Sequence, residues 1–353
     1  MITTQQVSQN ISFPLGQQPV AHGNAQKVAE GMYWIRMPLP FALDHINLWL
    51  IEDSIAGRDG WTLIDCGIDS EASRTLWQAL ISNQLMGKPI LRILATHMHP
   101  DHLGNAHWLC KQFNAPLWMS QPEFYAAHFA LTTDSGFGGP LASEFLASHG
   151  LSNLDWLKII ENRKNTYSQM VPDIPHQFMR LEHKDIVKIG KFSWQCIHGH
   201  GHSPDHISLF SPELAVLISG DMLLPKISTN VSVWATEPHS NPVEQFLNSL
   251  KLFENLPEQT LVCPSHGVPF IGVQRRIHEL TSHHKERLGE VLQACSKNPQ
   301  CAAEITQIMF SRSLDLHQIT FAIGEALAHL HWWWHKGDLH RKLGEDKVYR
   351  FHA

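Results

Sequence analysis

Metal-ligating side chains dominate the chemistry available to this sequence. His97, His99, Asp101 and His102 lie within six consecutive positions, directly after the apolar run 90–95. In an extended chain, residues two apart point to the same side, so His97, His99 and Asp101 can line one face where a strand ends. His102 then points another way, so the segment can offer ligands to two adjacent cations. Neutral imidazole and carboxylate ligands suit zinc, and also iron or manganese.

Four further short motifs surround this one in a recognisable order. They are LIDCG at 63–67, HGHSPDHI at 200–207, SGD at 219–221 and PSHG at 264–267. Together with the H-x-H-x-D-H spacing at 97–102, they resemble the metallo-β-lactamase superfamily over roughly residues 30 to 270. The metal motif is similar to that of the glyoxalase II-like members. Asp205 and Ser265 depart from the family pattern, because each stands where glycine is usual.

The resemblance implies a dinuclear metal site with a bridging carboxylate. The implied ligands are His97, His99 and His202 for one metal, Asp101, His102 and His266 for the other, and Asp221 between them. Such a carboxylate would hold two cations about 3.5–4 Å apart, and a water between them would lose a proton near neutral pH. That metal-bridging hydroxide would be the nucleophile, which Asp101 would help to orient.

Three supporting assignments are less direct. His198, His200 and His202 alternate along one strand, so His200 stays an alternative ligand to His202, which the offset to Pro204 favours. His206 is expected to support the turn or to orient a ligand, because metal ligands need hydrogen-bond partners of their own. Asp65 is a second orienting candidate, and a turn carboxylate at a strand end is its plainer interpretation.

The elements that must position these residues fit the superfamily's fold class, a four-layer αββα sandwich of α/β (α+β) type. We expect strands at 32–35, 46–51, 61–64 and 117–119, a helix at 71–85 and a helical stretch at 103–113. The catalytic domain would span residues 1–274. Within it, residues 121–180 form an expected helical insertion over the active site.

From about residue 275 the sequence predicts a separate domain, 275–353. Helices are expected at 277–295, 301–310 and 316–334, followed by a hairpin of 339–342 and 347–351. Three helices and a hairpin resemble the winged-helix-like tail of one branch of the superfamily. This tail carries 11 Lys and Arg against 9 Asp and Glu, and its third helix is apolar rather than basic. It therefore indicates packing onto the catalytic domain or a second subunit, as in a homodimer, rather than nucleic-acid binding.

Composition sets the remaining expectations. The net charge of −6 offers no general attraction to nucleic acid or anionic membranes. No apolar run approaches the ~20 residues of a membrane helix, and residues 1–16 lack the pattern of a signal peptide. The six cysteines form no C-x-x-C pair, which is typical of buried thiols in a reducing cytoplasm.

We therefore expect a hydrolase acting on a thioester or ester of a small acyl compound. Serine-hydrolase chemistry has no support because the sequence lacks a G-x-S-x-G motif. A nuclease that cleaves single-stranded RNA is the first alternative, favoured by the tail and opposed by the charge. A non-catalytic, metal-stabilised binding protein is the second alternative.

Overall fold

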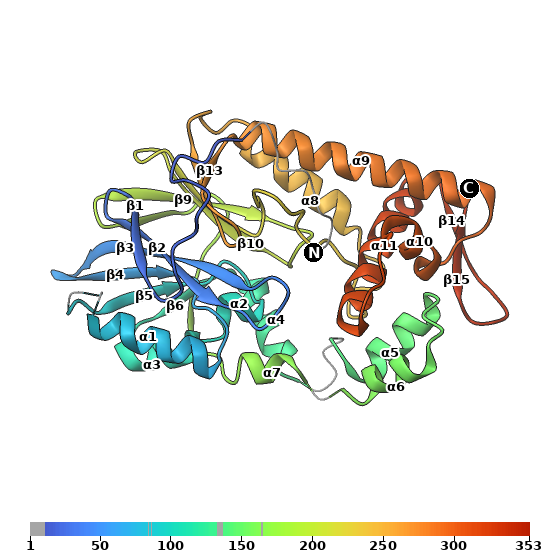
Figure 1. The fold of residues 1–353 in the computed structure, drawn as a ribbon, viewed down its shortest axis with the longest axis horizontal. Coiled ribbons are helices and arrows are strands. Elements are labelled where there is room, and N and C mark those ends of the chain that lie inside the picture. Colours follow the sequence, from blue (N-terminus) through green and yellow to red (C-terminus); the bar gives the residue numbers. More distant parts are fainter. Residues whose placement is uncertain (1–10, 84, 86, 133–136, 164) are drawn as a thin grey trace.

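Two β-sheets and the helices on their outer faces make up one half of the molecule, and helices with one β-hairpin make up the other (Figure 1). The structure, a computed structural model, describes residues 11–83, 85, 87–132, 137–163 and 165–353. A core of residues from both sheets fills the space between them, and further cores lie beneath the helices of each sheet. The expected αββα sandwich is confirmed.

The first sheet has seven strands that follow one another in chain order. They are β1 Ala25–Ala29, β2 Met32–Pro38, β3 His45–Ile55, β4 Arg58–Ile64, β5 Ile90–Leu94, β6 Leu117–Met119 and β7 Phe178–Arg180. The pairs from β1 to β4 are antiparallel, and those from β4 to β7 are parallel. Ala56 and Gly57 join β3 to β4 with positive φ at both residues, the geometry of a tight two-residue hairpin.

The second sheet has six strands in the order β13-β12-β11-β10-β9-β8. Their bounds are β8 Ile186–Ile189, β9 Phe192–Gly199, β10 His206–Ser211, β11 Val216–Gly220, β12 Leu261–Pro264 and β13 Phe270–Ile271. Asp53 of β3 and Arg92 of β5 form a buried ion pair of 2.7 Å. Arg92 also donates to the carbonyl of Lys188, and Gly190 N–H donates to Asp53, so this pair ties the first sheet to β8.

The outer face of the first sheet is covered by α1 (Glu71–Asn83), α2 (Pro100–Leu103) and α3 (Ala106–Phe113). The expectation of one uninterrupted helix over 103–113 is wrong. Gly104 lies so close to the neighbouring loop that a Cβ atom there would approach the amide nitrogen of Asp69 to 2.5 Å. The Asn105 side chain donates to the carbonyl of Ile68 at 2.7 Å. These two contacts hold the chain between α2 and α3.

The segment 121–180 contains four helices among its described residues, and these helices pack against two different parts of the protein. They are α4 Gln121–Ala130, α5 Gly139–Ser148, α6 Leu154–Glu161 and α7 Tyr167–Met170. On α4, the ring of Phe124 stacks on that of Phe178 in the first sheet, with 4.1 Å between the ring centroids. Residues of α5 and α6 join the core of the C-terminal helices instead, and Ala303 N–H donates to the carbonyl of His149.

The remaining helices lie between β11 and β12 or follow β13. They are α8 Pro242–Leu250, the short 3-10 helix η1 Lys251–Phe253, α9 Val273–Lys297, α10 Ala302–Met309 and α11 Leu316–Lys336, with the hairpin β14 His340–Leu343 and β15 Tyr349–His352. The predicted order of three helices and a hairpin is confirmed. The winged-helix comparison and the domain boundary near 275 stay predictions. Within the described residues, no helix combines the length and the apolar character needed to cross a bilayer.

The first residue of α8 is Pro242, and the Asn241 side chain before it does not cap the helix. The Asn241 amide donates instead to the Glu244 carboxylate in the first turn of α8 at 2.8 Å.

Candidate metal centre

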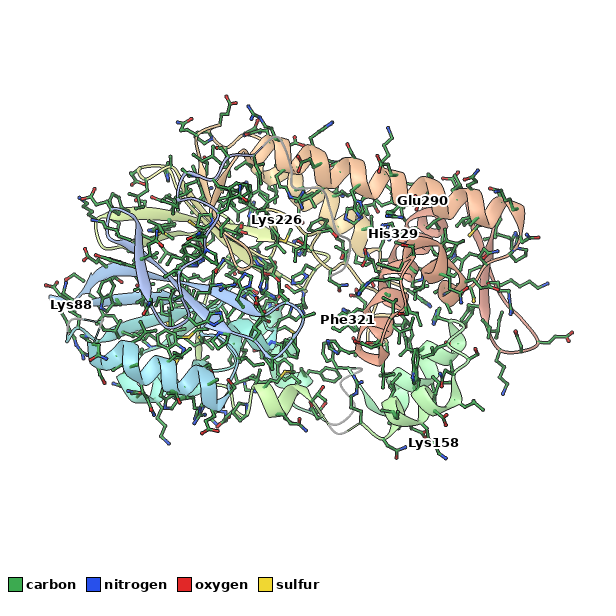
Figure 2. All side chains as sticks on the ribbon, viewed as in Figure 1. Lys88, Lys158, Lys226, Glu290, Phe321 and His329 are labelled. Carbon is green, nitrogen blue, oxygen red and sulfur yellow. The ribbon has the colours of Figure 1, made fainter. Side chains whose placement is uncertain are left out.

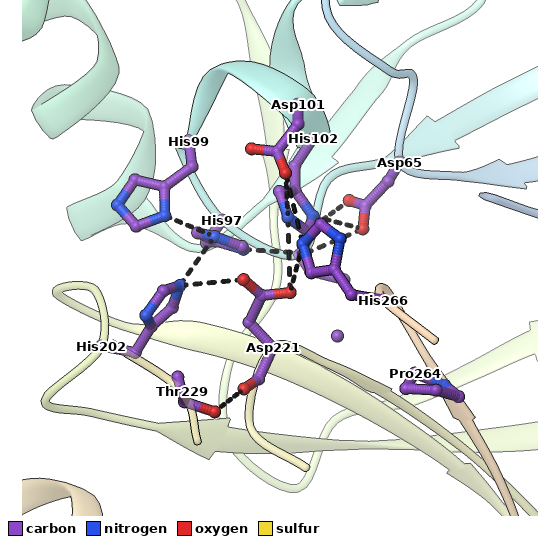
Figure 3. A network of polar contacts seen from close by, with 12 residues as sticks. Asp65, His97, His99, Asp101, His102, His202, Asp221, Thr229, Pro264 and His266 are labelled. Carbon is purple, nitrogen blue, oxygen red and sulfur yellow. Dashed lines mark hydrogen bonds and ion pairs between the residues drawn. The ribbon is translucent and has the colours of Figure 1, made fainter. Parts of the chain in front are cut away.

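The implied ligands meet where strands of both sheets end (Figure 3). His97 and His99 follow β5, and the turn after β9 carries His202. Asp221 directly follows β11, and His266 comes two residues after β12. Loops at strand ends position side chains on a rigid scaffold, which is where binding residues are usually found.

Seven side chains fall into three overlapping groups that each have the spacing needed to hold a metal ion. The groups are His97, His99 and His202; His97, His102 and Asp221; and Asp101, His102 and His266. Within each group the ligand atoms lie within 4.8 Å of one another. The structure therefore brings together all seven of the implied ligands.

Asp221 lies between the two outer groups. Its Oδ2 is 3.2 Å from Nε2 of His202, and its Oδ1 is 3.4 Å from Nε2 of His266. Asp101 approaches the same His266 nitrogen at 3.3 Å. Figure 3 shows the Asp221 carboxylate with one oxygen toward each side. A carboxylate in this position can contact two cations at once.

The structure separates the two candidate histidines of the 200–207 motif. His202 Nε2 is 3.2 Å from His97 Nε2, and His202 Nδ1–H donates to the carbonyl of Asn230. The His200 side chain is 47% exposed and its Nδ1 lies 2.9 Å from the carbonyl of Pro204. His202 thus belongs to the cluster, and His200 lies outside it.

Burial and charge act in opposite directions on two pairs of histidines in the cluster. Burial lowers the pKa of His97 well below its usual range and lowers the pKa of His99 to about 3. Burial also opposes charge at His102 and His266, but the carboxylates around them outweigh it and raise their pKa values to about 9 and about 10. His97 and His99 are therefore neutral at pH 7, which is the form of imidazole that binds metals.

Both carboxylates of the cluster are ionised. Burial opposes their charge, but His102 and His266 outweigh it and lower the pKa of Asp101 to about 2. The same two histidines lower the pKa of Asp221 well below its usual range. Two anions are thus stabilised in a buried site by the positive charge of neighbouring imidazoles.

Asp65 and His206 both support ligands rather than joining them. Asp65 accepts hydrogen bonds from Thr96 N–H at 2.7 Å and from Thr96 Oγ1 at 2.9 Å, and lies 2.8 Å from His102 Nδ1. It therefore orients the His102 ring and the segment leading to His97. His206 is fully buried, and its Nε2 accepts the N–H of Asp221 at 3.1 Å.

Two residues that the motifs do not include also support this centre. One is His45, whose carbonyl lies 2.7 Å from Nδ1 of His266 and whose ring Nε2 accepts the N–H of Gly267. Glu123 is fully buried and accepts hydrogen bonds from the segments that carry His97, His99 and His202. No sequence signal marks either residue, because their partners lie far away along the chain.

The pattern of unpartnered atoms fits two metal ions. Among the described residues, His102 Nε2 and His266 Nε2 are buried 3.6 and 3.4 Å from Asp221 Oδ1, and none of these three atoms makes a hydrogen bond. Buried polar atoms are normally satisfied, so three converging exceptions call for a ligand. The donor set of imidazole nitrogens and carboxylate oxygens is suited to zinc, iron or manganese. The residues present therefore fit a pair of divalent cations.

Comparison with known proteins gives relatives over most of the chain. A Burkholderia ambifaria structure described as a beta-lactamase domain protein is 46% identical, covers 97% of this chain and 98% of its own, and has a TM-score of 0.91. The probable metallo-hydrolase YqjP of Bacillus subtilis is 23% identical over 85% of this chain and 91% of its own length. A Legionella pneumophila hydroxyacylglutathione hydrolase is 23% identical over 62% of this chain and 61% of its own length.

Two family models account for both halves of the molecule. Residues 288–353 match the model of a metallo-beta-lactamase-like C-terminal domain. Residues 42–266, which contain the whole candidate centre, match the model of the metallo-beta-lactamase superfamily. The chain therefore belongs to the metallo-beta-lactamase superfamily.

Proposed function

We propose that this protein is a two-metal hydrolase that cleaves a thioester or ester of a small acyl compound. The observation that carries the proposal is the position of Asp221, with one carboxylate oxygen toward His202 and the other toward His266. Two divalent cations bound here, zinc by preference, would lower the pKa of a water between them and polarise the substrate's carbonyl oxygen.

The protein's own residues would hold and orient the reacting groups. Ionised Asp221 would fix the separation of the two ligand groups. Asp101 has a side chain that is 19% exposed, whereas the His266 side chain beside it is 1% exposed. Asp101 is therefore more accessible to a substrate than His266, and as an ionised acceptor it would orient the attacking water.

The acyl substrate is supported by charge and by one relative. The net charge of −6 disfavours a phosphodiester polyanion. The Legionella relative is named for the hydrolysis of a hydroxyacylglutathione, which is an acyl compound. All six cysteines are free and buried, which supports a reducing compartment, and we propose the cytoplasm.

The test is hydrolysis of a panel of acyl-thioesters, including acylglutathiones, and acyl esters by the metal-loaded protein. We expect turnover that is lost with a chelator and in Asp221→Ala. The control Asp59→Ala changes an exposed aspartate of β4 and should keep full turnover. A metal-loaded protein that leaves every thioester and ester intact would refute the acyl substrate. Chelator-sensitive cleavage of single-stranded RNA by the same sample would favour a nuclease instead.

A further inference from the structure

The backbone between the first two ligand histidines is held from both sides by side chains of the segment 121–180. The N–H of Met98 donates to Glu123 Oε2 at 2.9 Å. The carbonyl of Met98 accepts the hydroxyl of Tyr167 at 2.6 Å. Glu123 comes from the first turn of α4, and Tyr167 is the first residue of α7. Both backbone polar groups of this residue are thus fixed by buried side chains.

The same Glu123 carboxylate also holds the turn that carries His202. Its Oε1 accepts the hydroxyl of Ser203 at 2.6 Å and the N–H of Asp205 at 2.7 Å. One buried carboxylate therefore connects the two segments that supply His97, His99 and His202. The Glu123 side chain, which accepts from Met98, Ser203 and Asp205, is fully buried.

The three hydrogen-bond donors around Glu123 require a carboxylate and would not be satisfied by an amide of the same size. Burial raises the pKa of Glu123, and the hydrogen bonds from Ser203, Asp205 and Met98 oppose that shift. An ionised carboxylate accepts at both oxygens, so it satisfies all three donors. A glutamine would turn an N–H group toward at least one of them, leaving two donors facing each other.

We propose that Glu123 is a positioning residue for one metal only, the one held by His97, His99 and His202, and that Tyr167 assists it. The other ligand group is oriented by different partners, because Asp65 contacts His102 and the His45 carbonyl contacts His266. The proposal rests on the ligand assignment above, and it is independent of the acyl substrate. Removing Glu123 should therefore weaken the two metal positions unequally.

The experiment titrates Co²⁺ into the full-length protein after chelator treatment, with the visible absorption of bound cobalt as the readout. In the parent protein we expect two equivalents to bind. In Glu123→Gln we expect one equivalent to bind as in the parent and the other to need roughly 10–100-fold more free Co²⁺, the usual loss when a ligand's hydrogen-bond partner is removed. Crystals of Glu123→Gln grown at limiting Co²⁺ should show anomalous density for cobalt beside His266 and none beside His99.

Two further variants complete the test. Tyr167→Phe keeps the ring, removes one hydrogen bond and should weaken the same metal about threefold to tenfold, so it carries the test if Glu123→Gln does not fold. Glu144→Gln makes the same chemical change at an exposed position of α5 and should bind as the parent does. Parent-like affinity and spectra in both Glu123→Gln and Tyr167→Phe would overturn the proposal, as would equal weakening of both metals. A parent protein that binds no Co²⁺ would instead contradict the proposed function.

Discussion

At the residue scale, the cluster of candidate ligands was predictable because the information for it is largely local. His97, His99, Asp101 and His102 lie in one short motif, and its spacing carries the prediction without the fold. Glu123 could not be found in this way, since its partners Met98 and Asp205 are 25 and 82 residues away. The spacing of 198–202 left two ligand candidates, and only the path of the turn separates them.

Asp65 tests how strongly a ligand depends on its partner. Asp65→Asn replaces one acceptor oxygen by an N–H₂ group beside Thr96 and His102, which should lower metal affinity and turnover roughly 10–100-fold. Isothermal titration with Zn²⁺ and a thioesterase assay would measure both. The same replacement at exposed Asp59 is the matched control. Unchanged affinity in Asp65→Asn would mean that Asp65 is only a turn carboxylate.

At the scale of elements, helix and strand positions were predictable wherever an apolar pattern had clear ends. The helix at 71–85 is observed at Glu71–Asn83, and the strand at 117–119 is observed unchanged. The break between α2 and α3 was not predictable, because it results from the contact of Gly104 with a loop around Asp69. Such a break depends on tertiary packing, which leaves no mark in local periodicity.

Protonation of His331 in α11 should make the stability of the fold depend on pH. His331 is fully buried, and its Nδ1–H donates to the carbonyl of Ser240. Burial lowers its pKa from 6.5 to about 3. Between these values the unfolded chain binds a proton that the folded protein does not. The free energy of unfolding therefore falls as the pH decreases below 6.5, by about 1.4 kcal/mol per pH unit for this group.

Removing the titratable group should remove that part of the slope. We expect the free energy of unfolding of chelator-treated His331→Asn to lose about 2 kcal/mol less than the parent between pH 6.5 and 5, measured by urea unfolding. Figure 2 shows His329, another buried histidine of α11, among the C-terminal helices, so part of the slope should persist. Identical slopes in parent and His331→Asn would rule out this origin.

At the scale of the whole molecule, the segment 121–180 connects the metal-bearing sandwich to the C-terminal helices. Glu123 and Tyr167 contact the metal-bearing segments, while α5 and α6 share a core with α10 and α11. The sequence predicted helices here, and that the segment covers the metals stays a prediction. The two-sided packing was not predictable, because the aromatic and apolar residues of these helices fit several partners equally well.

Gly150 lies at the contact between this segment and α10. Its φ of +99° is strained for other residues, and a Cβ atom there would overlap the sulfur of Cys301. Gly150→Ala should therefore lower the free energy of unfolding by roughly 2–5 kcal/mol. Gly57→Ala has a positive φ but open space around it, so it should cost only about 1–2 kcal/mol. Equal losses in the two variants, measured by urea unfolding, would show that the contact with Cys301 contributes nothing.

The central claim is that two metals act together in one hydrolytic site. Stepwise return of Zn²⁺ to the chelator-treated protein, with thioesterase activity and bound metal measured in each sample, tests it most directly. We expect activity to rise with the second equivalent and to stay at background in Asp221→Ala at any zinc concentration. Full activity at one equivalent, or activity without metal, would contradict the two-metal account.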